Sequence, residues 1–393
     1  GYFVDTSSGG VTCNLPAGSA GAIVAFADYT RTFGSNNLTI SPNGSEKIGG
    51  FAADSILNVN GQSATFVYVD GTEGWINVQE TQTSQTGTSP YIIASGGTES
   101  TVGDFKVHTF TGPGTFTVCQ AGTAAPCSGS GSNAVEYIVI GGGGSGGRGY
   151  YGGGGGAGGF RFAAPLLAPA TYPAKPLAGP AALSVPATSY PIVVGAGGGA
   201  QPPSSKNPGS VSSFSTITSA GGGGGGNRNS PNPNKSGDDG ASGGGESNSG
   251  GPGAGGGNNP PVSPPQGNNG GTYFGGGGGG ATAVGASDDG AGSPYGAAGG
   301  AGGGFPNAFG TSGESCSPFY YFSGGGGGGG NSPSSNLVGG VGGGGNGGED
   351  GGCGSGQAAT ANTGGGGGGG GGNESLAGAG GSGIVIIRYK FQN

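Results

Sequence analysis

Uninterrupted runs of glycine recur through the second half of this chain and limit what it can fold into. The longest runs occupy residues 221–226, 275–280, 324–330 and 364–372. Glycine accounts for 110 of the 393 residues, and most of it lies beyond Gly141. Because glycine has no side chain to bury, such segments cannot form a conventional hydrophobic core. They are therefore either disordered or packed directly, backbone against backbone.

Composition favours ordered packing over a disordered linker. Aromatic residues interrupt the glycine runs, and charged residues make up only 8% of the chain, whereas disordered segments usually carry more charge. Glycine chains in the polyproline-II conformation have three residues per turn and no internal hydrogen bonds, so their amides can pair with neighbouring chains. Ordering each residue costs roughly 1–2 kcal/mol, which only a cooperative bundle offsets. We therefore predict a bundle of packed polyglycine-II helices.

Residues 1–80 predict a compact all-β domain. Short runs rich in β-branched and aromatic residues alternate there with turn signals. The predicted strands lie at 11–15, 23–26, 38–40, 64–69 and 75–78. The pairs Asn60-Gly61 and Asp70-Gly71 supply residues that tolerate the positive φ of tight hairpins. Trp75, the only tryptophan, is expected to pack in the core, with a sugar-stacking platform as the alternative.

The rest of the chain divides by composition into three parts. We predict a linker at 81–98, a β-base at 99–140 completed by a strand at 383–391, and a glycine-rich domain at 141–382 with variable loops. The strands predicted in the base lie at 105–110, 114–118 and 135–140. Essentially no α-helix is expected, because no apolar period of 3.6 residues is present and glycine and proline oppose helices.

The strands at the two ends of the glycine-rich domain have matching length and character. The apolar strand at 135–140 leads straight into Gly141, and the strand at 384–389 directly follows Gly383. Strands that flank an insertion commonly pair with each other. We therefore expect these two strands to pair, so that the glycine segments leave and return to one β-base.

The five cysteines are candidates for local disulfide chemistry rather than metal binding. Cys119 and Cys127 flank a short loop and suit a local disulfide, and Cys316 and Cys353 are candidates to pair across space. Cys13 lies in a strand pattern and is expected to be a buried free thiol. Because no CxxC motif or Cys/His cluster occurs, we expect no zinc site and no other metal or cofactor.

Charge and residue types exclude several functions. The net charge of −8 argues against nucleic acid, whose phosphates need a basic surface. No stretch of 18 or more apolar residues exists, so no membrane insertion is expected. His108, the only histidine, lies in a strand pattern without a Ser/His/Asp set, so we expect it to be structural and the protein not to be an enzyme.

The Asp pairs at 238–239 and 288–289 indicate solvated loop charges rather than calcium ligands. The start at Gly1 without methionine suggests a fragment or a processed product.

Five landmarks occur in an order that resembles the glycine-rich domain of bacteriophage tail proteins. They are VEYIVIGGGG at 135–144, GGGGGAGGFR at 152–161, YPIVVGAGG at 190–198, SSFSTITSAG at 212–221 and GSGIVIIR at 381–388. Residues 1–80 also resemble a module of phage virion proteins. In the related T-even-type distal tail-fibre adhesins, glycine runs fold into a sandwich of polyglycine-II helices, and loops at one end contact the bacterial receptor. This chain departs from them in its proline-rich stretches at 165–191 and 260–265, and nothing in it aligns with their fibre-attachment part.

The resemblance implies a virion structural protein, a tail fibre or adhesin located outside the host cell. A rigid glycine-rich scaffold would present loops to a host-surface receptor, protein or glycan, without a large ordering cost on binding. Other virion or fibre proteins would be partners, and the chain would form a homotrimer, as phage fibres often do. The alternative is a purely structural subunit of an extracellular filament or appendage that binds no receptor.

Aromatic residues in loops are the candidates for receptor contacts, because such rings offer binding area with few rotatable bonds. The candidate loops lie at 227–239, 258–274, 305–322 and 331–337. The candidate residues are Tyr273, Phe274, Phe305, Phe309, Phe319, Tyr320, Tyr321 and Phe322. The densest group, Tyr320 to Phe322, has an equally good alternative as a hydrophobic plug that caps the glycine bundle.

Overall fold

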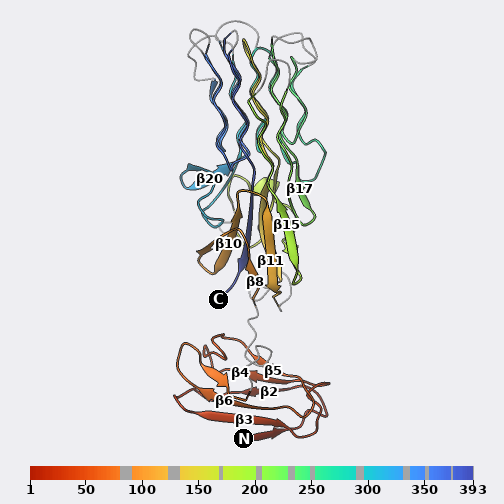
Figure 1. The fold of residues 1–393 in the computed structure, drawn as a ribbon, viewed down its shortest axis with the longest axis vertical. Coiled ribbons are helices and arrows are strands. Elements are labelled where there is room, and N and C mark those ends of the chain that lie inside the picture. The colour runs from red at the N-terminus through yellow and green to blue at the C-terminus, as the bar shows by residue number, and fades with distance from the viewer. Residues whose placement is uncertain are drawn as a thin grey trace. The chain divides into compact units, whose positions relative to one another are not determined.

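The computed structural model describes residues 1–79, 91–122, 133–167, 171–200, 206–228, 235–247, 253–288, 296–330, 337–349, 354–372 and 375–392. Over these residues the chain consists of β-strands, extended segments and turns, with one 3₁₀ turn, η1 (Lys175–Leu177), and no α-helix (Figure 1). The predicted β class is confirmed to that extent. The chain divides into a smaller unit, mainly Gly1–Tyr91, and a larger unit that holds most of the rest. Within the described ranges no helix is long and apolar enough to cross a membrane.

The smaller unit consists of two β-sheets that share one core. Four strands form the first sheet in the order β1-β3-β6-β7, and β2, β4 and β5 form the second. The bounds are β1 (Tyr2–Val4), β3 (Ile23–Asp28), β6 (Ser63–Tyr68), β7 (Trp75–Asn77), β2 (Val11–Asn14), β4 (Leu38–Ser41) and β5 (Ser55–Leu57). Phe26, Phe66 and Trp75 from the first sheet pack with Leu38 and Ile40 from the second. Both sheets thus supply buried side chains to the same core.

The five strands predicted in this unit are confirmed, whereas β1 and β5, each three residues long, were not predicted. Trp75 is fully buried, which confirms its place in the core, and its indole N–H donates to Glu46 Oε2 at 3.2 Å. Gly61 has the expected positive φ, of 80°. In the turn before Trp75, however, the positive φ falls on Gly74 rather than Gly71, because Asp70 Oδ1 accepts the N–H groups of the next residues and widens the turn.

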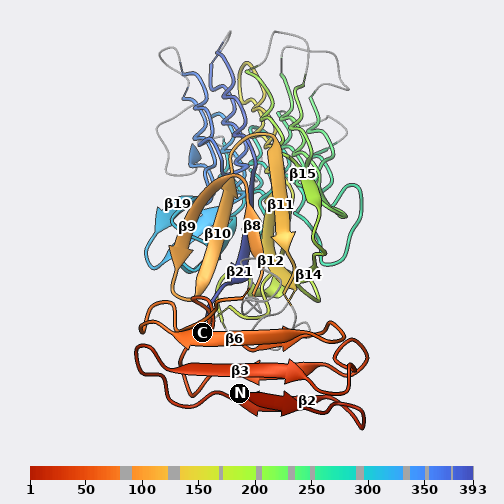
Figure 2. The same cartoon turned by 60° about the horizontal axis from the view of Figure 1, so that its bottom comes forward.

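The larger unit is built on three sheets (Figure 2). A six-stranded sheet has the order β13-β12-β21-β10-β9 with β14 beside β12, a five-stranded sheet has the order β17-β16-β15-β11-β8, and a three-stranded sheet has the order β18-β20-β19. The bounds are β8 (Ile93–Ser95), β9 (Thr98–Val102), β10 (Phe105–Phe110), β11 (Gly114–Gln120), β12 (Ala134–Ile140), β13 (Phe160–Ala163), β14 (Leu183–Ser184), β15 (Ser189–Val193), β16 (Ser212–Phe214), β17 (Ile217–Ser219), β18 (Gly303–Phe305), β19 (Glu314–Cys316), β20 (Phe319–Phe322) and β21 (Ile384–Lys390).

The predicted pairing of the strands that flank the glycine-rich domain is confirmed. β12 and β21 are antiparallel neighbours, in register from Glu136↔Arg388 to Ile140↔Ile384. β21 also pairs with β10 on its other side. The chain therefore enters the glycine-rich domain from one central strand of the six-stranded sheet and returns to the strand beside it.

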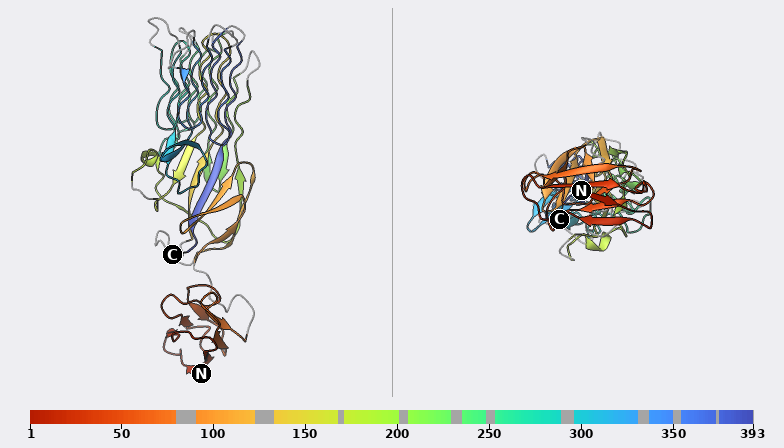
Figure 3. Two further views of the ribbon diagram at one scale, coloured as in Figure 1. Left: turned by 90° about the vertical axis from the view of Figure 1, so that its left-hand side faces the viewer. Right: turned by 90° about the horizontal axis from the view of Figure 1, so that it is seen from below.

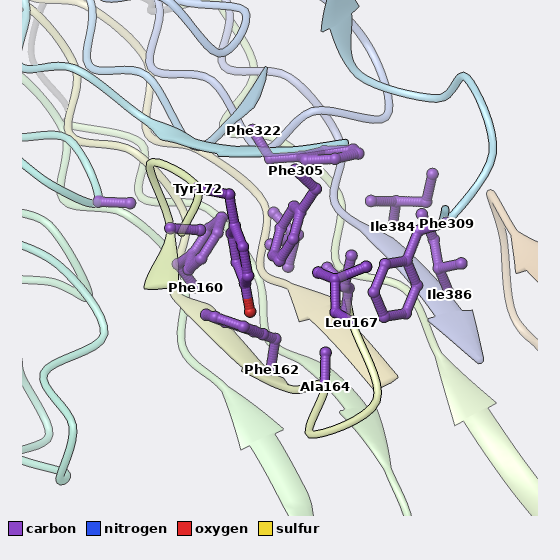
Figure 4. Packing of buried hydrophobic residues seen from close by; sticks show 14 of the residues in the cluster. Phe160, Phe162, Ala164, Leu167, Tyr172, Phe305, Phe309, Phe322, Ile384 and Ile386 are labelled. Atoms are coloured by element: carbon purple, nitrogen blue, oxygen red, sulfur yellow. The ribbon is translucent and has the colours of Figure 1, made fainter. Parts of the chain in front are cut away.

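Both faces of β12 are buried, because this strand lies between two cores. Tyr137 and Val139 face the five-stranded sheet, where they pack with residues such as Phe116. Ile138 and Ile140 face the opposite side and belong to a second cluster, here called the aromatic core (Figure 4). The aromatic members of that core are Phe160, Phe162, Tyr172, Phe305, Phe309 and Phe322. This double burial explains why the strand at 135–140 reads as one continuous apolar run.

The glycine-rich region also supplies strands to the sheets. β13, β15, β16 and β17 all lie within residues 141–382; β13 and β15 pair with strands of the base, and β16 and β17 extend the five-stranded sheet beyond β15. β13, β15 and β16 carry buried apolar residues, among them Phe160, Ile192 and Phe214. In the interval predicted as a linker, residues 93–95 form β8, and residues 80–90 lie outside the described part of the chain.

From these sheets the glycine residues continue as extended segments that lie side by side (Figure 3). Residues 141–147 leave β12, the chain reverses at 148–151, and residues 152–159 return to β13. The reversals beside the sheets are here called the sheet end, and those on the opposite side, such as 148–151, the far end (Figure 1). The larger unit thus has two distinct kinds of scaffold, one held by side chains and one held by main chain.

Candidate functional site

The segment at 152–159 illustrates how the glycine backbones pack. Its N–H groups donate to three neighbouring segments in rotation, so that every third residue meets the same neighbour. The donor and acceptor residues are Gly152 with Gly370, Gly155 with Gly367 and Gly158 with Gly364; Gly153 with Gly226, Gly156 with Gly223 and Gly159 with Ala220; and Gly154 with Gly276 and Ala157 with Gly279. The N···O distances are 2.8 to 3.0 Å, which are good hydrogen bonds.

The carbonyl groups of the same segment accept hydrogen bonds from three further neighbours. Gly141, Gly144 and Gly147 donate from the preceding segment, Ser242 and Gly245 from a second, and Gly326 and Gly329 from a third. The segment therefore has six hydrogen-bonded neighbours around it, and each of its amide N–H groups is paired. A buried backbone without side chains is stable only when its polar groups are satisfied in this way.

The same contacts leave no room for side chains. A Cβ atom on Gly154 would lie 2.0 Å from the carbonyl oxygen of Gly326, and one on Gly155 would lie 2.2 Å from that of Gly144. Gly199, by contrast, is exposed and would meet nothing within 4 Å. Glycine is thus required where a segment is packed among neighbouring segments, and it is not required at exposed positions such as Gly199.

A cluster of aromatic rings with one cation lies at the far end of this scaffold. Tyr150, Tyr151, Phe274 and Arg228, here called the far-end cluster, come from three separate chain segments. The Tyr151 ring is 5.9 Å from the Tyr150 ring and 5.8 Å from the Phe274 ring. The guanidinium carbon of Arg228 lies 4.8 Å from the centre of the Tyr151 ring and 5.5 Å from that of Tyr150. Tyr273, beside the cluster, is 47% exposed.

The backbone around the cluster is fixed by buried polar side chains. Tyr151 and Tyr273 have φ angles of 53° and 65°, a left-handed conformation that costs a non-glycine residue about 1–2 kcal/mol. Glu246 is 3% exposed, and its Oε2 accepts the N–H of Tyr273 at 2.9 Å. Asn227 is 1% exposed, and its Oδ1 accepts the N–H of Arg148 at 2.6 Å. Because these partners are themselves held by the glycine segments, the rings occupy defined positions.

Flat aromatic faces next to a guanidinium suit several ligand types. The rings can stack on a sugar or on another aromatic group, and Arg228 can bind a carboxylate or a phosphate with paired N–H groups. The cation–π contacts, about 0.5–1 kcal/mol each at exposed sites, keep the guanidinium over the tyrosines until a ligand competes for it. The far-end cluster can therefore bind, but its described residues include no acid–base pair for catalysis.

The structure separates the eight predicted receptor-contact residues into two groups. Tyr273 and Phe274 lie at the far end, whereas the other six lie at the sheet end. Phe305, Phe309 and Phe322 are only 1–2% exposed and belong to the aromatic core (Figure 4). The prediction is corrected for these three residues, because a side chain packed in a core cannot meet a receptor. Of the group Tyr320 to Phe322, for which a hydrophobic plug was the alternative, only Phe322 lies in this core.

The remaining three candidates, Phe319, Tyr320 and Tyr321, lie on β20 and are partly exposed. They stay candidates for binding, but at the sheet end and not beside Tyr273. Of the predicted loops, the one at 258–274 runs from a sheet-end turn, where Asn258 Oδ1 accepts the N–H groups of Val262 and Gln266, to the far end. In the loops at 227–239 and 331–337, residues 229–234 and 331–336 lie outside the described ranges.

Sequence reasoning missed Tyr150 and Tyr151 as site residues, and it included Arg228 in the candidate loop at 227–239 without naming it. A signal was present, because only four residues separate the glycine-rich segments at 141–147 and 152–159, so the chain must reverse there. Arg228 likewise follows the run at 221–226 almost directly. A large side chain at the end of a glycine run marks a position where close packing of the backbones stops.

The predicted disulfides stay predictions. Cys119 and Cys316 are exposed, and their proposed partners, Cys127 and Cys353, lie outside the described residues. Cys13 is a free thiol, as expected, but it is only partly buried. Burial raises the pKa of its thiol and so disfavours the reactive thiolate.

Three of the four paired aspartates are engaged with the scaffold, and Asp289 lies outside the described residues. Asp238 forms an ion pair with Lys206, and Asp239 Oδ1 accepts the N–H of Gly256 at 2.6 Å. Asp288 is buried, and its Oδ2 accepts the N–H of Gly296 at 3.2 Å, which corrects its interpretation as a solvated loop charge. In the described part of the chain, no group of three His, Cys, Asp or Glu residues is placed to hold a metal ion.

His108 is fully buried between the two large sheets. Its Nδ1 lies 2.7 Å from the carbonyl oxygen of Gly96, which can only accept, so Nδ1 carries the proton and Nε2 accepts the hydroxyl of Tyr389 at 3.1 Å. Burial is the largest effect on the imidazole and lowers its pKa. The Gly96 carbonyl and Glu99 raise this pKa in part, whereas Lys106 lowers it further. A neutral histidine tied to two sheets is structural, as predicted.

The stability of the larger unit is expected to fall as the pH drops below about 6.5, the ordinary histidine pKa. Because the folded pKa of His108 is depressed, the unfolded chain binds the proton first, and each pH unit costs up to about 1.4 kcal/mol until the folded pKa is reached. Urea titrations of the wild type and His108→Gln between pH 7.5 and 5 measure this. A difference in unfolding free energy that is constant with pH would contradict the assignment.

These features define a β-rich protein in which close-packed main chain replaces a side-chain core over much of the fold. Residues 120–390, well over half of the chain, match the family model described as a glycine-rich domain, and the chain belongs to that family. A comparison with curated proteins finds no match.

Proposed function

We propose that the glycine segments of residues 141–382 form a bundle of polyglycine-II helices. The support is the rotation of hydrogen bonds along 152–159, since a conformation with three residues per turn directs every third amide to the same side. Six neighbours around one segment fit the side-by-side packing of such rods. The carbonyl contacts that a Cβ would meet at about 2 Å, as at Gly154, fit the same arrangement.

The chain is, on this proposal, a bacteriophage virion structural protein, a tail fibre or adhesin that binds a receptor on the host surface. The observation that carries the proposal is the far-end cluster, in which Tyr150, Tyr151, Phe274 and Arg228 are held at one end of a hydrogen-bonded scaffold. Rings fixed before binding lose little conformational entropy when a ligand arrives. The sequence resemblance to phage tail proteins and the glycine-rich family both favour this context.

The proposal assigns a location and partners. The protein would be extracellular, on the virion, and its receptor would be a protein or glycan of the bacterial surface. Other fibre or virion proteins would hold it, and a homotrimer would present three copies of the far-end cluster. Multiple copies raise the overall avidity without any new contact.

Substitutions in the far-end cluster and at Tyr273 beside it test receptor binding. Tyr273→Asn combined with Arg228→Ala removes an exposed ring and the cation, while asparagine tolerates the left-handed backbone at that position. We expect particles that carry this variant to adsorb to their host at least about tenfold less, as for hot-spot residues. The matched control is Tyr29→Asn, since Tyr29 is a 70% exposed tyrosine of the smaller unit.

Two outcomes would contradict the proposal. Adsorption of the double variant equal to that of the wild type would exclude the far-end cluster as the receptor site. Electron micrographs that show a continuous filament with subunits along its length, rather than copies at a fibre tip, would favour the purely structural alternative. Exchange of residues 305–322 between related chains tests the sheet-end candidates Phe319, Tyr320 and Tyr321 separately, and an unchanged host range would count against them.

A further inference from the structure

A second candidate site lies at the sheet end of the larger unit, on the three-stranded sheet that contains β19 and β20 (Figure 2). It is a pocket of about 300 Å³. Four rings form its apolar lining: Pro306, Pro318, Phe319 and Tyr320. Its volume is at the lower end of the range of about 300 to 1,000 Å³ that is typical of small-molecule sites. The pocket therefore suits one ring-sized group rather than a long chain.

The polar lining of this pocket is uncharged. It consists of Asn307, Ser315 and Ser317, whose side chains make no hydrogen bond to any residue that the structure describes. A hydroxyl group both donates and accepts, and an amide supplies one acceptor oxygen and two N–H donors. Glu314, the nearest carboxylate in the chain, accepts the N–H groups of Gly342 and Gly343, both at 2.6 Å, and is not part of the lining.

The walls of the pocket are fixed by the aromatic core. Tyr320 pairs with Phe305 on one side and with Ser315 on the other, in antiparallel register. Phe305 is buried, stacked on Phe160 at 5.5 Å and in edge contact with Phe162 at 4.8 Å. A core residue thus anchors the strand that carries the pocket's tyrosine, so the site is formed before any ligand binds.

We propose that this pocket binds an uncharged saccharide unit. A pyranose has an apolar C–H face that packs on rings such as Phe319 and Tyr320, and hydroxyl groups that both donate to and accept from Asn307, Ser315 and Ser317. An acidic sugar would find no lysine or arginine in the lining. This site is separate from the far-end cluster and does not depend on the proposed receptor function.

Calorimetric titration of the whole chain tests the proposal. The probes are neutral hexoses, N-acetylhexosamines and their short oligosaccharides, with glucuronic acid and a proline-rich peptide for comparison. We expect a neutral saccharide to bind, and Asn307→Ala with Ser317→Ala to weaken that binding about tenfold, because two hydrogen-bonding groups are lost. Both residues are exposed, so the thermal midpoint should not change.

Two controls distinguish binding in this pocket from binding elsewhere on the chain. Ser100→Ala, at an exposed serine of β9, should leave saccharide binding unchanged, and Tyr273→Asn reports any saccharide that is bound at the far end. The proposal is overturned if no neutral saccharide binds at millimolar concentration, if glucuronic acid or the peptide binds better, or if the double variant binds like the wild type. Loss of saccharide binding in Tyr273→Asn would assign the binding to the far end instead.

Discussion

Gly155→Ala is expected to destabilise the larger unit by about 3 kcal/mol, at the upper end of what overpacking a rigid interior costs. The added Cβ would lie 2.2 Å from the carbonyl oxygen of Gly144 and 2.7 Å from that of Ser145. The segment cannot move aside, because Gly155 itself donates to Gly367 and accepts from Gly326 on other sides. A shift that relieves one contact therefore breaks hydrogen bonds to another segment.

Gly199→Ala is the matched control for this substitution. A Cβ at Gly199 meets nothing within 4 Å and its φ is not left-handed, so we expect no loss, or a gain of about 0.4–1 kcal/mol from a less flexible unfolded chain. Scanning calorimetry measures both variants. Trp75, the only tryptophan, lies in the smaller unit, so its fluorescence should report the same transition in every variant. Equal effects of the two substitutions would refute the packing argument.

Arg388→Met is expected to cost about 3–5 kcal/mol of stability, because it leaves a buried carboxylate without its partner. Arg388 Nε lies 2.9 Å from Glu136 Oε2, and both side chains are only 3% exposed. These two atoms are a close ion pair rather than a well-aligned hydrogen bond. Glu136 Oε1 also accepts the N–H of Leu166, and the guanidinium packs 3.9 Å from the centre of the Phe105 ring.

The pH dependence of this variant identifies the cause. Burial raises the pKa of Glu136 even with Arg388 present, and removal of the cation raises it further. A folded pKa above the unfolded value, about 4.3, means that the penalty is present at neutral pH and is relieved as the pH falls through the folded pKa. Chemical denaturation at pH 7 and pH 4.5 should therefore show a smaller loss at the lower pH.

A second substitution at the partner residue is the control. Glu136→Gln together with Arg388→Met replaces the ion pair by neutral groups, and we expect it to recover most of the stability lost in Arg388→Met. A double variant as unstable as the single one would show that the lost packing on Phe105 and Phe309, rather than the unpaired charge, causes the effect.

The elements that could be predicted from the sequence are those indicated by a residue pattern within the element itself. The pairing of β12 with β21 followed from two long apolar strands at the ends of one insertion, and the core position of Trp75 followed from the strand pattern around it. The strands β16 and β17 have three residues each and form a short hairpin with each other, and segments of this length are too short for a period of two residues to assign them to a sheet.

The candidate site was harder to predict, because exposure depends on contacts between distant segments. Phe305 and Phe322 resemble Tyr273 and Phe274 in sequence, since all four are aromatic residues beside glycine runs. What separates them is Phe160 and Phe162, more than 100 positions away, which cover Phe305 at the sheet end. No such residues cover Tyr273, which is 47% exposed at a reversal on the opposite side.

The neighbours of the segment at 152–159 dictate when this protein can finish folding. Gly155 donates to Gly367, a residue synthesised more than 200 positions later, and Gly158 waits for Gly364 in the same way. A ribosome-bound chain that ends before these residues leaves the segment at 152–159 without one of its six neighbours. Contacts of such long sequence separation slow folding. The segment at 152–159 is thus synthesised early, but its last neighbour, the segment at 364–370, is synthesised only near the end of the chain.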